Sequence, residues 1–139
     1  MNNLNRFIEA QETSYDIALS EIKNGKKRSH WMWYIFPQIQ GLGVSETAKF
    51  YALKDIEEAQ NFLNHPVLGH RLINITEELL RLDSGDAYAI FGSPDDVKLK
   101  SSMTLFTSLT KTNPVFPAVL KKFFNGATDG KTLEIIGKQ

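Results

Sequence analysis

Hydrophobic residues recur every three or four positions along most of the chain, which is the spacing of an amphipathic helix. Near the start, one helical face collects Leu4, Phe7, Ile8, Gln11, Tyr15, Ala18, Leu19 and Ile22. Gly25 follows this run, and glycine often ends a helix because it tolerates a left-handed backbone. The pattern therefore predicts a first helix that stops just before Gly25.

Capping signals predict two further helices and the start of another. Ser45 can cap a short helix, and Asp55 and Glu58 have the spacing of a capping box. The helix that opens at Asp55 must end near residues 64–66, because Pro66 disfavours a helical residue before it and suits the first turn of the next helix. The expected buried side of that next helix comprises Val67, Leu68, Leu72, Ile75, Leu79 and Leu82.

The clearest helix start is the run 93–96. It offers Ser93 as a cap, Pro94 for the first helical position and two carboxylates for the positive end of the helix dipole. The inward side chains of this helix are expected to be Leu99, Met103, Phe106 and Leu109. Another helix is expected from Val115 to Asn125-Gly126, and a last short turn over 129–136 closes the chain.

One segment, 87–91, could form a strand, and a single strand makes no sheet. The pattern therefore predicts an all-α fold: a compact, multi-helix single domain over residues 1–139, with at most a minor strand. A chain of 139 residues can bury a core without a metal or disulfides.

Composition and charge exclude several classes of function. The formal net charge is +0, which argues against general nucleic-acid binding. The chain has no cysteine, so disulfides, thiol catalysis and thiolate zinc sites are excluded. The first residues lack the apolar core of a signal peptide, and no apolar run approaches the ~20 residues that span a bilayer. We expect a cytoplasmic protein with no membrane association and no cofactor.

Both tryptophans, Trp31 and Trp33, lie in one aromatic segment over residues 29–38. Trp31, Trp33 and Phe36 cannot share one helical face, so packing alone explains the segment poorly. Two interpretations stay open. The segment is a plug in the core, or it is the wall of a ligand pocket in which Trp31 or Trp33 stacks on a flat group. A ligand wall requires that at least one tryptophan be partly exposed to solvent.

Polar residues around this segment are candidate ligand contacts. The cations Arg28, Arg71, Lys98 and Lys100 could meet phosphates, and His30, Gln38 and Ser102 could complete a binding site. Each also has a plainer explanation: the basic triplet 26–28 can be a solvated loop, Lys98 can pair with Asp95, and Ser102 can bond back to its helix. No metal site is expected, because His65 and His70 would lie on different helix faces. The expected role of His65 is that of a helix cap.

Glu46 is the candidate catalytic residue. It follows the glycine turn 41–43 at a helix start, where the dipole favours its ionised form. A carboxylate beside an aromatic shelf can stabilise an oxocarbenium ion or activate water at a glycosidic carbon. The alternative is that Glu46 only contributes to capping.

Four stretches, 30–38, 41–43, 65–72 and 98–106, resemble a widespread family of uncharacterised small proteins. The stretches read HWMWYIFPQ, GLG, HPVLGHRL and KLKSSMTLF. The family carries a domain-of-unknown-function label, and some of its members were once titled calpastatin. The resemblance covers nearly the whole chain and implies a compact helical fold, with no activity attached.

A second resemblance, to an N-glycosidase superfamily, lies in the order of several motifs. These are the glycine turn, Ser45-Glu46, Phe50–Lys54, Leu68–Arg71 and Asn113-Pro114. Members of that superfamily act on ADP-ribose conjugates and riboflavin-pathway intermediates, and the resemblance implies that Glu46 is catalytic. The chain lacks the C-terminal Trp-Gly, followed by Asn and Gly, of that pattern.

Two functional hypotheses follow. In the first, the protein has an aromatic-walled pocket for a nucleotide-like or ADP-ribose-like ligand and acts as an N-glycosidase-type hydrolase or a binding protein. In the second, it is a non-catalytic interaction module whose aromatic segment is core or a docking surface. The sequence leaves enzymatic activity and oligomeric state open.

Overall fold

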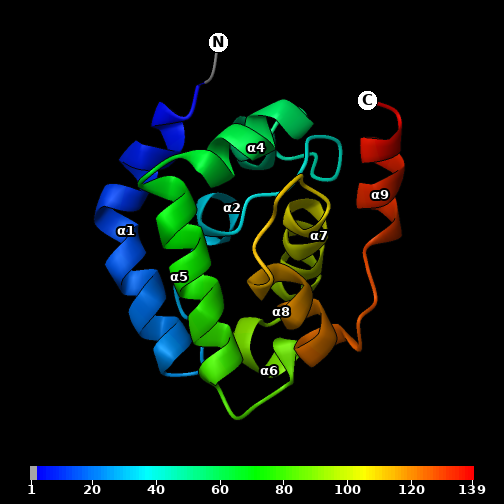
Figure 1. Cartoon of the computed structure of the whole chain (residues 1–139). Helices are drawn as coiled ribbons and strands as arrows, with labels where there is room; N and C mark the ends of the chain where they lie inside the picture. Colours follow the sequence, from blue (N-terminus) through cyan, green and yellow to red (C-terminus); the bar gives the residue numbers. More distant parts are fainter. Residues whose placement is uncertain (1–2) are drawn as a thin grey trace.

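Nine helices run through the part of the chain that the computed structural model describes, residues 3–139 (Figure 1). In chain order they are α1 (Asn5–Lys23), α2 (Met32–Ile35), α3 (Glu46–Tyr51), α4 (Ile56–Asn64), α5 (Leu68–Arg81), α6 (Ala87–Phe91), α7 (Asp95–Thr107), α8 (Val115–Phe124) and α9 (Gly130–Gly137). The all-α prediction is confirmed. The segment considered as a strand is the short helix α6, and strand-like pairing among these residues is limited to an isolated parallel bridge between Ile39 and Leu53.

The helices share one hydrophobic core, and α7 lies at its centre. In Figure 1, α1 and α5 lie side by side, and α9 covers the opposite side of the molecule. Helix α7 contacts α4, α6, α8 and α9, and every residue from Ser101 to Phe106 is buried. Because α7 is buried on several sides, its hydroxyl side chains Ser102 and Thr104 lie inside the protein.

Several predicted helix ends are confirmed, with one exception. Helix α1 ends at Lys23, and Gly25 has a left-handed backbone with φ of 73°. His65 caps α5, because its Nδ1 accepts from the backbone N–H groups of Val67 and Leu68. The predicted cap at Ser93 is wrong: α7 begins at Asp95 with no side-chain cap, since the backbone carbonyls of Gly92 and Pro94 already accept from its first N–H groups.

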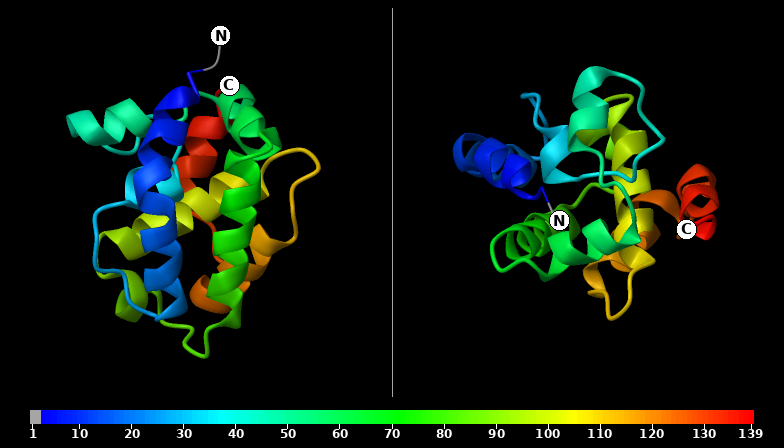
Figure 2. Two further views of the ribbon diagram at one scale, coloured as in Figure 1. Left: turned by 90° about the vertical axis from the view of Figure 1, so that its left-hand side faces the viewer. Right: turned by 90° about the horizontal axis from the view of Figure 1, so that it is seen from above.

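The segment 41–52, called here the α3 loop, projects from the body of the molecule. Figure 2 shows α3 extending sideways from the other helices. The bridge closes the base of this loop: the Gln40 N–H donates to the Leu53 carbonyl over 2.8 Å, and the Leu53 N–H donates to the Gln38 carbonyl over 2.9 Å. Helix α3 itself has no buried residue.

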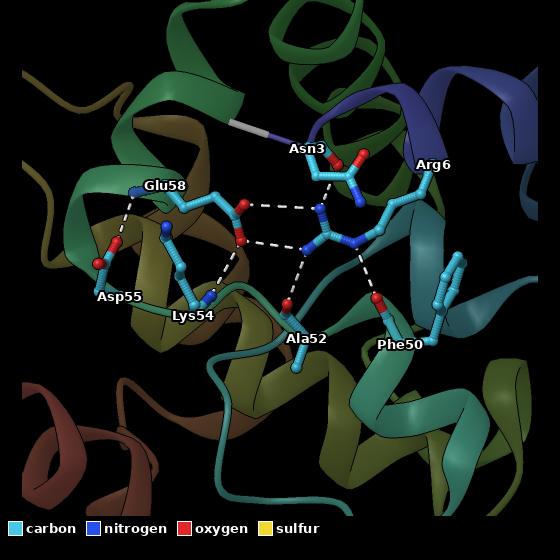
Figure 3. A network of polar contacts seen from close by, with 7 residues as sticks. All are labelled: Asn3, Arg6, Phe50, Ala52, Lys54, Asp55 and Glu58. Atoms are coloured by element: carbon cyan, nitrogen blue, oxygen red, sulfur yellow. Dashed lines mark hydrogen bonds and ion pairs between the residues drawn. The ribbon is translucent and has the colours of Figure 1, made fainter. Parts of the chain in front are cut away.

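Arg6 joins the α3 loop to the helices behind it (Figure 3). Its Nε donates to the Phe50 carbonyl over 2.7 Å, and its Nη2 donates to the Ala52 carbonyl over 2.8 Å. The same guanidinium forms an ion pair with Glu58 of α4, with Nη2 and Oε1 separated by 3.1 Å. The side chains of Arg6 and Glu58 are only 8% and 4% exposed, so water screens this pair weakly.

Candidate functional site

The two tryptophans have different environments. Trp31 is 1% exposed, and its indole N–H donates to Glu21 Oε1 over 2.8 Å. The rings of Phe36 and Phe91 pack around it. Trp31 is therefore a core residue with no face open to a ligand. Trp33 is half-buried, so it meets the condition that a ligand wall sets for one of the two tryptophans.

Three charged side chains, Lys98, Asp95 and Lys27, form a series of contacts that begins at the Trp33 ring. Lys98 Nζ lies 5.0 Å from the centre of a Trp33 ring, within the range of a cation–π contact. Asp95 Oδ1 is 3.6 Å from this ammonium group, so the predicted pairing of Lys98 with Asp95 is confirmed. Asp95 Oδ2 is 2.8 Å from Nζ of Lys27. Asp95 thus holds two lysines on the side of the molecule where Trp33 is exposed.

Two adjoining spaces lie beside these residues. The larger one, called here the α7 hollow, encloses about 230 Å³ and is lined by Gln38, Leu42, Gly43, Pro94, Val97, Lys98, Ser101, Asp129 and Lys131. The smaller one, called here the Trp33 space, encloses about 10 Å³ and is lined by Trp33, Gln38, Ile39, Gly43, Ala48, Tyr51 and Ala52. The two spaces share Gln38 and Gly43, so they meet at the glycine turn.

The lining of the α7 hollow suits an anion. Lys98 and Lys131 bring two ammonium groups, and Gln38 brings an amide that can donate or accept. The Asp129 carboxylate is occupied, because its Oδ2 accepts from the backbone N–H and the hydroxyl of Thr132 at the start of α9. The lining therefore carries two ammonium groups against one carboxylate, an excess of one positive charge.

Three predicted site residues come together here: Trp33 and Gln38 line the Trp33 space, and Gln38 and Lys98 line the α7 hollow. Sequence reasoning missed Ser101, Asp129 and Lys131. Asp129 had a local signal only as a helix start, and it does cap α9. Their position in the site depends on the packing of α9 against α7, which leaves no trace in local spacing.

The structure places the other predicted binding residues elsewhere, and none of them lines either space. Arg71 lies on α5 and faces α1, and its Nη1 donates to Gln11 Oε1 over 3.4 Å. Lys100 lies 6.0 Å from the Phe124 ring of α8. Ser102 is fully buried with no hydrogen-bond partner on its hydroxyl. The remaining two, Arg28 and His30, are exposed in the loop before α2.

Glu46 lies at the exposed start of α3, on a shallow surface hollow lined by residues of α3 alone. These residues are Glu46, Thr47, Lys49, Phe50 and Tyr51. Glu46 does not line the α7 hollow. Tyr51 borders both the Trp33 space and the hollow beside Glu46, so the two regions meet at one ring.

Glu21 of α1 holds the loop between α1 and α2 in place. Its carboxylate accepts from the backbone N–H groups of Arg28 and Ser29, from the Ser29 hydroxyl and from Trp31. Burial alone would raise the pKa of the Glu21 carboxyl, but these hydrogen bonds outweigh it and lower the pKa to about 2. Glu21 is therefore ionised and fully bonded at neutral pH, which suits a structural role.

Residues 3–139 hold neither a metal-binding cluster nor a membrane-spanning helix. This part of the chain contains no group of three or more His, Asp or Glu side chains placed to hold a metal ion. None of its helices has the length and apolar character that crossing a membrane requires.

Comparisons with known proteins place the chain in a family. Residues 1–136 match the family described as "Protein of unknown function (DUF1810)". Among solved structures, the chain is similar to the conserved hypothetical protein Rv1873 from Mycobacterium tuberculosis, with a TM-score of 0.95 and 42% sequence identity over 97% of this chain and 96% of that chain. No curated protein matches the chain. Neither description names an activity, so the function has to be argued from the residues.

Proposed function

The chain belongs to the DUF1810 family of proteins of unknown function, and we propose that it binds a small anionic, nucleotide-like ligand at the α7 hollow. The observation that carries this proposal is the convergence of Trp33, Gln38 and Lys98 on two adjoining spaces. An aromatic ring, an amide and a cation at one place are the groups that recognise a flat base linked to a phosphate.

Each group has a distinct part in binding. The α7 hollow encloses about 230 Å³, less than the ~300–1,000 Å³ of a typical drug-sized pocket, so it suits a small ligand or the charged part of a larger one. The phosphate would lie between Lys98 and Lys131. A flat ring would replace the Lys98 ammonium group on the Trp33 ring, and Lys98 would then turn towards the phosphate. Gln38, which borders both spaces, would bond to the part between ring and phosphate.

The docking-surface hypothesis fits the aromatic segment less well. Most residues from Trp31 to Pro37 are buried, and Trp33 borders the small Trp33 space. A docking surface would instead present a broad, exposed apolar patch.

Hydrolysis of an N-glycosidic bond is a second candidate, favoured by the position of Tyr51 between Glu46 and the Trp33 space. Glu46 would orient a water whose oxygen bonds to the ribosyl carbon as the carbon–nitrogen bond to the base breaks, and the proton that the water loses would go to the departing base. The Glu46→Gln variant should then retain ligand binding and lose the release of free ADP-ribose, measured by chromatography. Equal release by both proteins would show that Glu46 is not the catalytic residue, and no release by the parent protein would leave ligand binding as the function.

The binding proposal is tested by measuring the melting temperature and the tryptophan fluorescence with inorganic phosphate, AMP, ADP and ADP-ribose. A ligand at about 100 times its Kd should add about 2.7 kcal/mol to the free energy of unfolding. Lys98→Ala should weaken binding about tenfold or more, because it removes a charged contact. Lys100→Ala is the matched control, since this lysine lies on the same helix but against α8, and it should change the Kd little.

Two results would contradict the proposal. One is the absence of binding by all four compounds at millimolar concentration. The other is an equal loss of affinity in Lys98→Ala and Lys100→Ala, which would show that the α7 hollow has no special role.

A further inference from the structure

We propose that the α3 loop is a hinged flap over Trp33, and that the buried Arg6–Glu58 pair is the latch that holds it closed. This inference rests on the proposed function, because it concerns how a flat ring reaches Trp33. It assigns a role in ligand access to two residues that lie outside both spaces.

The α3 loop covers Trp33. One side of the Trp33 space is formed by Ala48, Tyr51 and Ala52 of the loop, and the other by Trp33 and its neighbours. The enclosed volume of about 10 Å³ has room for roughly one water molecule and none for an aromatic ring. A ring can therefore reach the part of Trp33 that borders this space only after the loop moves. Because Gly43 borders both spaces, this movement would join the Trp33 space to the α7 hollow.

The loop is built to move as a unit. None of the residues of α3 is buried, and Val44 and Phe50 are already 86% and 56% exposed. Lifting the loop would therefore break mainly the core contacts of Leu42 and Tyr51, which are partly buried. The bridge between Ile39 and Leu53 keeps its base closed. Gly41 has a φ of 110°, a conformation that other residues rarely adopt, and it provides a flexible point where the loop begins.

Tyr51 is the main ring contact between the flap and the helices behind it. Its ring centre lies 5.1 Å from that of Tyr34 and 5.9 Å from that of Phe7. With the partly buried Leu42, this ring makes a small apolar anchor for a loop of this length. The direction of α3 must therefore be fixed largely by polar contacts.

Arg6 supplies those contacts (Figure 3). Its guanidinium holds the carbonyls of Phe50, inside α3, and Ala52, just after it. Two acceptors at successive points along the chain fix the direction in which the helix leaves the body. Glu58 fixes the guanidinium in turn, and its Oε1 also accepts from the Lys54 N–H over 3.0 Å. Arg6 lies on α1 and Glu58 on α4, so both halves of the latch belong to the body.

The absence of cysteine allows a direct test, because one introduced thiol is the only one in the protein. Ala48→Cys places it on the covered side of the flap, facing the Trp33 space. Val44→Cys places a control thiol at an exposed position of the same loop. The measurement is the rate at which a disulfide reagent labels each thiol, without ligand. The cysteine at 48 should react at least tenfold more slowly than the one at 44.

The latch is tested in the same two backgrounds. Arg6→Lys keeps the positive charge but loses the planar fork that bonds two carbonyls and a carboxylate together. It should speed labelling at position 48 about tenfold and leave position 44 within twofold. Glu58→Gln keeps the shape, removes the ion pair and should act in the same direction. Circular dichroism identifies any variant that fails to fold, and the other variant then carries the test.

Without ligand, two results would overturn the flap: equal labelling rates at positions 48 and 44 in the parent background, or no change at position 48 in folded latch variants. These rates need no ligand, so the flap is tested even if the proposed binding fails. If ADP or ADP-ribose does bind, it should alter the rate at position 48. Binding with an unchanged rate would overturn the flap and leave the proposed function intact.

Discussion

At the scale of single residues, Glu21 connects the first helix to the loop that carries both tryptophans. Its carboxylate bonds to the backbone of Arg28 and Ser29 and to the indole of Trp31. On the far side of the same loop, Lys27 donates to the Ser29 carbonyl and pairs with Asp95, which also holds Lys98. The position of the lysine in the proposed site therefore depends on a framework that begins at Glu21.

Glu21→Gln should destabilise the protein by about 2 kcal/mol at neutral pH. The pKa of Glu21 is lowered from 4.5 to about 2 on folding, so its ionised form stabilises the protein fully above pH 4.5. This contribution is lost as the pH falls from 4.5 towards 2. The difference between parent and variant should thus shrink over that range, measured by urea unfolding at several pH values. Glu12→Gln, exposed on the same helix, is the control.

A pH-independent difference between the Glu21→Gln variant and the parent would contradict this assignment. So would an effect of equal size in Glu12→Gln, because that side chain is exposed and lies outside the framework.

Local sequence could single out Trp33, Gln38 and Lys98, because each has an unusual residue type for its surroundings. It could not separate Trp33 from Trp31, which is the same residue two positions away. The distinction comes from Glu21 of α1 and Phe91 of α6, which contact Trp31 from outside the aromatic segment. Burial decided by such long-range partners has no signature in the segment itself.

At the scale of secondary structure elements, Lys122 of α8 completes the end of α5. Its ammonium group donates to the carbonyls of Leu79 and Leu80, each over 3.1 Å, and to that of Leu82. The last carbonyls of a helix lack partners within it, and the helix dipole favours a cation there. Lys122 meets both needs and fastens α8 to α5.

Lys122→Met should therefore destabilise the protein by about 1–3 kcal/mol, because it leaves part-buried carbonyls without a donor. Lys121→Met is the matched control, since Lys121 is the exposed neighbour on the same helix and should change the free energy of unfolding by less than about 0.5 kcal/mol. Urea unfolding of both variants measures the difference. Equal effects would show that the cap contributes nothing to stability.

Most helix ends could be predicted because their signals are local. Ser45, Asp55 and Asp129 each accept from a backbone N–H within the first turn of their helix, as such signals indicate. Helix α6 was harder to predict, because its five residues are too few to show a helical period. Asp86, which accepts from the Ala89 N–H, was its overlooked start signal.

At the scale of the whole molecule, the helices form or pack against one core, so the protein should unfold in a single transition. Circular dichroism reports the helices, and fluorescence reports the tryptophan segment. The two should give the same midpoint in urea. Loss of tryptophan fluorescence at a clearly lower urea concentration would show that the segment is not part of that cooperative unit.

The burial of α7 has a consequence for how the sequence can vary. Residues 101–106 are all buried, and the helix touches four others, so nearly every position faces a neighbour. A larger side chain at Ser102 or Thr104 would have to displace a whole helix, whereas changes on the exposed sides of α3 or α9 displace only water. In a library of all single substitutions, α7 should accept the fewest replacements. Evolution at the surface of this fold would then proceed around a centre that changes slowly.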